Sequence, residues 1–409
     1  MRAASGSSTD CGARRGGETS AGLYVHVPFC RSRCGYCAFV SSPLGKAPGA
    51  LMRDYVECLA LELRRRMFRE GAGLRFDTLY VGGGTPSTLP ADLIDRLFEL
   101  IGEETRGGFS EITFECNPED LRERPQLPAQ LEALGVSRLS VGVQSFEARG
   151  LRALERGVDE AGLRRVLCEL PEQFGGAIIW DLILGWPGQE SEGFMKNEVE
   201  MIARLLPAGL SVYSLIYEAG TRLHKGVLQG RVTALDQDGE AELWQVWLEA
   251  AERMGYRQVE ISSFTRAGEG SRHNRDTWLG KPYLGIGCGA VSRLGRVRWS
   301  NCAGPQEYID RLRAGRWPAA SAEFLNPERA WQEELMLRLR HERGLDFGDF
   351  AHRHGFHPEA LAGDLVADAL GRGWLLRMPG GLRFSPAGWM LYDGIVSDWM
   401  MEIEKALGR

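Results

Sequence analysis

Three cysteines on one short segment are the residues of this chain whose type and spacing could do chemistry. Cys30, Cys34 and Cys37 follow an apolar, strand-like run that starts at Leu23 and ends at Pro28. Thiolates at this spacing can turn inward onto one inorganic centre, and cysteine thiolates are the usual protein ligands of iron–sulfur clusters. Three sulfurs leave one corner of a 4Fe-4S cubane without a protein ligand, and an open coordination position is where a metal centre can react. The segment therefore predicts a 4Fe-4S cluster with these three cysteines as its ligands.

Two other uses of the cysteines stay open from the sequence alone. A zinc site could combine the three thiolates with His26 as fourth ligand, although zinc sites usually bring their ligands in two pairs. A disulfide framework is less favoured, because 9 cysteines in 409 residues are sparse and odd in number and nothing marks the chain as secreted.

The spacing C-x-x-x-C-x-x-C, with Tyr36 just before the last cysteine, resembles the signature of the radical S-adenosylmethionine (SAM) enzymes. The longer pattern Y-x-H-x-P-F-C, from Tyr24 to Cys30, is similar to one branch of that family. This branch holds the oxygen-independent coproporphyrinogen III oxidases and the HemW-type heme chaperones. The resemblance implies that the open iron binds SAM, that an electron donor is a partner, and that reduction can cleave SAM to a 5′-deoxyadenosyl radical.

Composition places the chain among soluble globular proteins. Hydrophobic residues make up 44% and charged residues 25% of the chain, which is ordinary, and no apolar run reaches membrane-spanning length. A net charge of −6 argues against a dedicated nucleic-acid-binding protein, which usually carries a basic surface. Residues 1–21 are rich in Gly, Ser and Arg, and we expect a disordered tail there, not a secretory signal. These features predict a cytoplasmic protein without stable membrane insertion.

Strand-like and helical segments alternate through the first half of the chain, which is typical of parallel βα units. The expected strands are 23–27, 74–81, 111–115, 138–143, 177–184 and 210–215, and the expected helices are 51–69, 91–101, 127–134, 161–170 and 190–205. Such a series is too short for a closed eight-stranded barrel. The resemblance implies an α/β fold in which residues 22–260 form a partial, three-quarter TIM-like (βα)6 barrel of the radical SAM type.

The rest of the chain is expected to form a branch-specific extension over 261–325 and a C-terminal domain over 326–409. Within that domain the pattern predicts helices at 327–341, 347–354, 358–370 and 389–406 and a hairpin at 374–384. This arrangement resembles a winged helix. Winged helices often bind DNA, but the chain lacks a basic excess, so we expect a lid or docking surface.

Polar side chains lie at or near the carboxyl ends of the expected strands, where parallel α/β folds place functional residues. Three glycines before Thr85 would let a ligand approach the backbone closely, and GGGTP also resembles the family element that holds the SAM amino group. Asp181 interrupts an apolar strand, where a charge is costly unless paired, and a salt bridge with Arg156 is the structural alternative. The resemblance implies the following cofactor-binding residues: Tyr24, Tyr36, Gly83, Gly84, Thr85, Glu115, Gln144, Arg156 and Asp181.

A later segment resembles the same branch and suggests where heme could bind. The heme-chaperone pattern H-N-x-x-Y-W reads here from His273 to Trp278, with Thr277 in place of the tyrosine. Histidine can ligate heme iron, so His273 is predicted to bind heme. A loop histidine bonded to the backbone is the alternative.

The branch leaves two functions of different class. One is the oxidative decarboxylation of coproporphyrinogen III to protoporphyrinogen IX, in porphyrin biosynthesis. The other is a chaperone that binds heme and delivers it to acceptor proteins. The oxidases resemble C-x-x-x-C-x-x-C-x-C, whereas Phe39 stands at the position of the fourth cysteine, and the expected tail could not form the structured segment that precedes the first strand in the oxidases. Both features favour the heme chaperone. The resemblance also implies a monomer or dimer, and no catalytic residue is predicted.

Overall fold

A computed structural model of the chain describes residues 19–44, 48–70, 74–105, 107–268 and 270–408, so most of the predicted tail lies outside the described residues. Its largest element is a 12-stranded mixed sheet. The strands expected from the sequence form its parallel centre: β1 (Thr19–Val27), β4 (Leu74–Gly83), β5 (Glu111–Cys116), β6 (Arg138–Gln144), β7 (Ala177–Leu184) and β8 (Gly209–Ser214). Each pairs in parallel with the next in this order. All of these strand predictions are confirmed.

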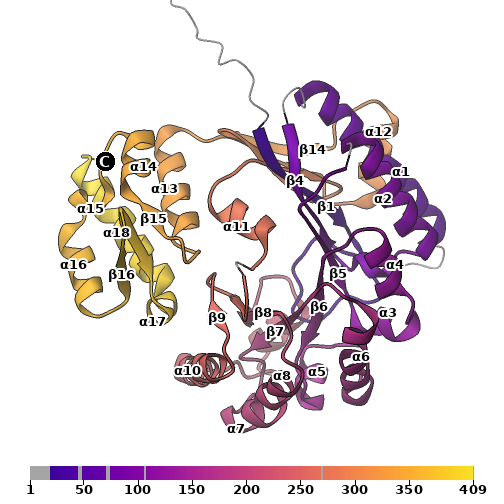
Figure 1. Ribbon diagram of the computed structural model, residues 1–409, viewed down its shortest axis with the longest axis horizontal. Coiled ribbons are helices and arrows are strands. Elements are labelled where there is room, and N and C mark those ends of the chain that lie inside the picture. The colour runs from indigo at the N-terminus through magenta and orange to yellow at the C-terminus, as the bar shows by residue number, and fades with distance from the viewer. Residues whose placement is uncertain (1–18, 45–47, 71–73, 106, 269, 409) are drawn as a thin grey trace, which may run out of the picture.

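Helices cover the outer side of this parallel centre, as Figure 1 shows. They are α1 (Pro48–Glu70), α2 (Ala91–Thr105), α3 (Pro118–Glu123), α4 (Leu127–Ala133), α5 (Ala148–Ala153), α6 (Glu160–Gln173), α7 (Ser191–Phe194) and α8 (Glu200–Leu205). The helix expected over 190–205 is interrupted by a π turn, η2 (Met195–Val199). Hydrophobic periodicity indicates a helix but does not distinguish a π turn from an α turn.

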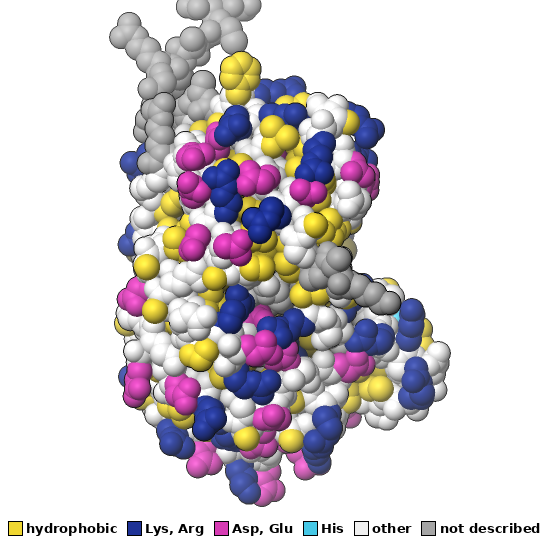
Figure 2. Space-filling model, turned by 90° about the vertical axis from the view of Figure 1, so that its right-hand side faces the viewer, with side chains coloured by type: hydrophobic (Ala, Val, Ile, Leu, Met, Phe, Trp, Pro, Cys, Tyr) yellow, Lys and Arg dark blue, Asp and Glu magenta, His cyan; other side chains and the backbone are white. Residues whose placement is uncertain are grey.

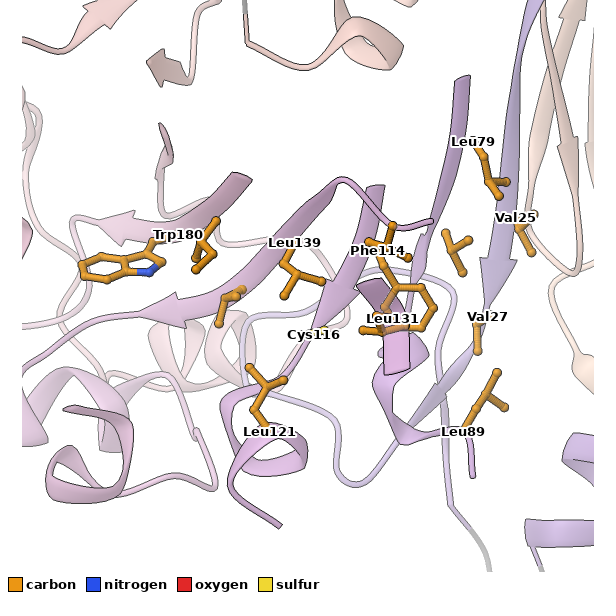
Figure 3. Packing of buried hydrophobic residues seen from close by; sticks show 14 of the residues in the cluster. Val25, Val27, Leu79, Leu89, Phe114, Cys116, Leu121, Leu131, Leu139 and Trp180 are labelled. Atoms are coloured by element: carbon orange, nitrogen blue, oxygen red, sulfur yellow. The ribbon is translucent and has the colours of Figure 1, made fainter. Parts of the chain in front are cut away.

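The core lies between the strands and these helices. On β1, Leu23, Val25 and Val27 are fully buried on the helix side, while the residues between them point to the inside of the curved sheet. Figure 3 shows side chains of neighbouring strands in one layer, with residues of α3 and α4 packed against them. This alternation leaves the inner face free to carry polar groups.

The sheet extends beyond its parallel centre at both edges. β11 (Tyr283–Ile286) pairs in parallel with β1 and is followed by the antiparallel strands β12 (Val291–Leu294), β13 (Val297–Asn301) and β14 (Ala319–Phe324). At the other edge lie β10 (Ser263–Thr265) and β9 (Arg257–Gln258). β14 and β9 lie at the two ends of the strand order and do not pair with each other, so among the described residues the barrel is open. The predicted α/β fold with a partial barrel is confirmed.

Several further helices belong to the connections of the barrel and its extension. They are α9 (Arg222–Leu228), α10 (Gln237–Arg253), α11 (Arg272–Trp278) and α12 (Pro305–Arg313). Helix α11 replaces the loop considered for His273 and lies on the inner side of the sheet (Figure 1).

The C-terminal residues have a hydrophobic cluster of their own, with Trp331, Phe350 and Trp399 almost fully buried. Its helices are α13 (Pro327–Arg338), α14 (Phe347–His354), α15 (Pro358–Leu361), α16 (Gly363–Gly371), α17 (Pro386–Trp389) and α18 (Tyr392–Ala406). The predicted hairpin is confirmed as β16 (Leu375–Met378) and β17 (Gly381–Phe384), with β15 (Leu345–Asp346) as a third strand. The single helix expected at 358–370 is instead two, because the backbone of Ala362 leaves the helical region (φ −137°).

Charged side chains of both signs are mixed on the surface shown in Figure 2. On the face shown in Figure 2, the Lys and Arg side chains of the described residues lie among Asp and Glu and do not gather into one basic patch. Within the described part of the chain, every helix is too short or too polar to cross a bilayer.

Candidate functional site

A cavity of about 430 Å³ lies on the inner side of the sheet, bounded by the cysteine loop, the glycine turn after β4 and residues of β5 to β8. This volume is within the usual range for small-molecule sites. The lining brings together most of the predicted site residues: Cys30, Cys34, Cys37, Tyr36, Gly83, Gly84, Thr85, Glu115, Gln144, Arg156 and Asp181. Tyr24 and His273 are not part of the lining.

The cysteine loop is held at both ends by a short parallel pair, β2 (Phe29–Cys30) and β3 (Ser42–Pro43). Within it, the Cys37 amide donates to the Cys34 carbonyl over 3.3 Å. All three thiols are free and half-buried. The Thr85 hydroxyl donates to Cys30 Sγ (3.5 Å), and the Arg156 guanidinium donates to Cys34 Sγ (3.3 Å). Two of the three sulfurs therefore face donors from distant parts of the chain.

The geometry fits a cluster better than a single zinc ion. Both ring nitrogens of His26 are occupied, by the Tyr24 hydroxyl (3.0 Å) and the Val40 carbonyl (2.8 Å), so His26 is not available as a ligand. Zn–S bonds of about 2.3 Å require sulfurs roughly 4 Å apart, and within the described ranges no three His, Cys, Asp or Glu side chains are close enough for one ion. The thiols nevertheless share one cavity, as a larger inorganic core requires.

The glycine turn packs tightly under the cysteine loop. Gly83 has a φ of +114°, and a Cβ there would lie 2.4 Å from the His26 ring. A Cβ on Gly84 would lie 2.7 Å from the Pro28 backbone. The amides of Gly84 and Thr85 donate to the carbonyls of Val27 and Phe29, each over 2.8 Å. The fold itself thus requires glycine at these two positions, because a side chain would collide with the cysteine loop.

Two carboxyl groups face the cavity from β5 and β7, the strands on either side of β6. Glu115 accepts from the Tyr80 hydroxyl and from the Gly83 amide, each over 2.9 Å. Burial, helped by the charge of Asp181, raises the pKa of Glu115 to about 7. Burial also raises the pKa of Asp181 to about 6, although its bond from the Ser140 hydroxyl (2.8 Å) opposes the shift. Both groups would be stabilised as anions by a cationic ligand.

Arg156 connects three parts of the cavity wall. Besides Cys34, it donates to the Asn117 side chain and to the Gly142 carbonyl, each over 2.8 Å. Within the described residues it forms no ion pair with Asp181 closer than 4 Å, so the structural alternative of a salt bridge is not present. Arg156 is a bridge between the loop, β5 and β6.

Gln144 ends β6 in a left-handed conformation (φ 69°), which is uncommon for a residue other than glycine. The next turn is held by Glu198 of η2, whose carboxylate accepts from the Ser145 hydroxyl (2.6 Å) and the Phe146 amide (3.1 Å). Burial raises the pKa of Glu198 to about 7. The buried carboxyl fixes the backbone that presents Gln144 to the cavity.

Tyr36 lines the cavity, whereas His273 lies deeper in the barrel. Tyr36 also packs against a hydrophobic cluster that contains Ile183, Trp186 and Leu215. His273 is 8% exposed. Its Nδ1 lies 2.9 Å from the Thr78 hydroxyl, and burial lowers its pKa to about 4.

Sequence reasoning missed several lining residues. They include Tyr80, Asn117, Arg138, Ser140, Ser211 and Asn274. On the strands, the signal was period-2 alternation, which places Ser140 on the same face as Gly142 and Gln144. Asn274 could not be placed, because α11 was not expected.

Comparison with known proteins agrees with this geometry. Residues 24–198 match the model of the radical SAM superfamily, and residues 325–391 match that of the HemN C-terminal domain. The heme chaperone HemW of Mycobacterium tuberculosis is 30% identical over 85% of this chain and 88% of its own length. HemW of Bacillus subtilis is 28% identical over 93% of this chain and 99% of its own.

A mitochondrial relative and a solved structure extend the comparison. The mouse radical S-adenosyl methionine domain-containing protein 1, mitochondrial, is 31% identical over 95% of this chain and 89% of its own length. The structure of coproporphyrinogen III oxidase (HemN) from Escherichia coli superposes with a TM-score of 0.79 at 23% identity, over 93% of this chain and 90% of that one. It supports the fold. Membership of the superfamily implies a 4Fe-4S cluster, SAM and an electron donor. The chain belongs to the radical SAM superfamily, in the family of the HemW proteins.

Proposed function

We propose that this chain is a heme chaperone of the HemW type, which binds heme and passes it to acceptor proteins. The observation that carries the proposal is the cysteine loop. It offers three free thiols to one cavity, and Phe39, 71% exposed, stands where the oxidases have a further cysteine. The similarity to relatives named heme chaperone over most of the chain supports the same choice.

In this proposal Cys30, Cys34 and Cys37 hold the cluster, which would supply the electron for SAM cleavage. The residues around the cavity hold SAM: Tyr36, Gly83, Gly84, Thr85, Glu115, Gln144, Arg156 and Asp181. Tyr24 lies outside the cavity lining and contributes to the site through its hydrogen bond with His26. Glu115 and Asp181 face a ligand with a positive sulfonium and ammonium, and that attraction offsets the cost of their burial. Arg156 holds the Cys34 sulfur, the Asn117 side chain after β5 and the Gly142 carbonyl of β6 in fixed relation.

The proposed domains are the barrel at 22–260, the extension at 261–325 and the C-terminal domain at 326–409. The separate hydrophobic cluster between Trp331 and Ile403 supports the last boundary. Acceptor proteins are the proposed partners, and the chain would act in the cytoplasm, where free thiols persist, as a monomer or dimer. Heme ligation by His273 stays a prediction, and it requires α11 to expose a ring that is now buried.

Hemin titration of the purified, cluster-loaded protein tests the proposal. We expect a Soret band that saturates with hemin and no conversion of coproporphyrinogen III under reducing, anaerobic conditions with SAM. Formation of protoporphyrinogen IX would establish the oxidase instead. Absence of a saturable Soret band would contradict the chaperone.

A further inference from the structure

A second cavity, of about 240 Å³, lies where the barrel meets the C-terminal domain. We call it the junction cavity. Figure 1 shows α11 between the curved sheet on one side and α13 on the other. The side chains used below come from the end of α11, the β12–β13 hairpin, α13 and α14: Trp278, Arg293, Arg296, Glu334, Arg338 and Arg353.

The lining has more positive than negative charge. Four arginines face one glutamate. Glu334 serves two of them, Arg338 at 3.7 Å and Arg353, and it also bonds to the His354 ring at 2.9 Å. Arg293 is paired with Glu333, which lies outside the lining, at 3.1 Å. Arg338 and Arg353 therefore share the carboxylate of Glu334, and Arg296 has no carboxylate partner among the described residues.

Burial makes this imbalance costly for Arg338, whose side chain is only 15% exposed. The Nε of Arg338 is buried and donates no hydrogen bond among the described residues. Burial lowers the pKa of Arg338, with Glu334 opposing the change and Arg353 adding to it. A buried guanidinium without full compensation is stabilised by an anion, most strongly by one that can bond in bidentate geometry.

The junction cavity also contains an aromatic ring, and helix α11 connects it with the main cavity. Trp278 contributes its half-buried indole, on which Arg340 stacks at 5.7 Å. Trp278 ends α11, and Asn274 of the same helix lines the main cavity. A ligand of the junction cavity would thus contact the helix that also closes the first site.

We propose that the junction cavity binds a propionate of the heme cargo. This rests on the proposed function, which gives the chain a flat aromatic ligand with two carboxylates. The volume is below the roughly 300–1,000 Å³ of sites that enclose a whole ligand, so only the acidic edge of the macrocycle enters. The arginines bind the carboxylate, and the indole lies beside the adjoining ring edge. A free phosphate would offer similar charge, and the test separates the two.

The test compares hemin with hemin whose propionates are methyl esters, and adds inorganic phosphate as a competitor. The variant is R296Q/R353Q, because Arg296 is exposed and Arg353 is 42% exposed, so the fold tolerates both changes. R372Q is the matched control: Arg372 lies in the same domain and is 57% exposed, with an i,i+4 partner as Arg353 has, but it is outside the junction cavity. Circular dichroism checks that each variant folds.

We expect the double variant to bind hemin about tenfold more weakly than the parent, since charge-assisted hydrogen bonds are lost. The dimethyl ester should bind the parent about as weakly, and R372Q should match the parent. Equal hemin affinity in parent and double variant would overturn the assignment while leaving the chaperone function intact. So would arginine-dependent phosphate binding that does not compete with hemin. A parent without a Soret band would overturn both.

Discussion

Replacement of Glu115 by Gln tests whether the cavity holds a carboxyl group whose ionisation destabilises the folded protein. The pKa of Glu115 is raised from its ordinary 4.5 to about 7. A carboxyl whose pKa is raised by folding favours the folded state while protonated, below about pH 4.5, and this stability is lost as the pH rises to about 7. A difference of about 2.5 pKa units at about 1.4 kcal/mol each corresponds to about 3.5 kcal/mol.

Glutamine cannot ionise, so E115Q removes the pH-dependent part. Tyr80 and Gly83 donate to different oxygens of Glu115, and Gln has one acceptor oxygen. The variant therefore loses one hydrogen bond, about 1 kcal/mol, at every pH. Relative to the parent, E115Q should be about 1 kcal/mol less stable at pH 4.5 and about 2.5 kcal/mol more stable at pH 8. Glu115 is only half-buried in the cavity wall, so water in the cavity makes these figures upper values.

Urea denaturation of the apoprotein, followed by circular dichroism from pH 4.5 to 8, measures this difference. The exposed Glu172, which has no ion pair among the described residues, gives the control E172Q, and its curve should run parallel to that of the parent. D181N should reduce the effect, because the charge of Asp181 is the second cause of the raised pKa. Parallel curves for E115Q and the parent would refute the account of the cavity's electrostatics.

Three further predictions follow from the site. G83A should lower the free energy of unfolding by more than about 2 kcal/mol, because its Cβ would lie 2.4 Å from His26 and the backbone φ is +114°. G102A on α2, where a Cβ meets nothing within 4 Å, should raise it by about 0.5–1 kcal/mol. Thermal denaturation compares the two variants. R156M should cost about 3 kcal/mol in urea and slow cluster reconstitution, since three acceptors lose their donor. SAM binding, followed by calorimetry, should tighten about tenfold from pH 5.5 to 8 as the two cavity carboxyls, with pKa values of about 6 and 7, become anionic; a flat profile would contradict their role.

The parallel centre of the sheet could be predicted because its signals are local. β7 is a nearly continuous apolar run, and β1 alternates buried residues with residues of the inner face. The glycine turn follows β4 directly, so strand order alone placed it near the cysteine loop. The cavity lining agrees with the predicted residues where they lie at the carboxyl ends of these strands.

The rest depends on distant contacts that local patterns do not record. β1 pairs with β11, more than two hundred residues later, and β11 is only four residues long. Helix α11 has seven residues, and a cap at Ser271 is its main local signal. The role of Glu198 depends on a π turn and on a bond to Ser145 across the fold, so a helical wheel would place it as an ordinary polar residue.

Iron and sulfide analysis after anaerobic reconstitution tests the central claim, that three thiols share one inorganic core. The parent should bind about four irons and four sulfides per chain, and C168S, at an exposed cysteine away from the cavity, should do the same. The triple variant C30A/C34A/C37A should bind none, with loss of the electron paramagnetic resonance signal of the reduced cluster. A triple variant that still takes up the full complement, or a parent that holds a single zinc ion instead, would contradict the account.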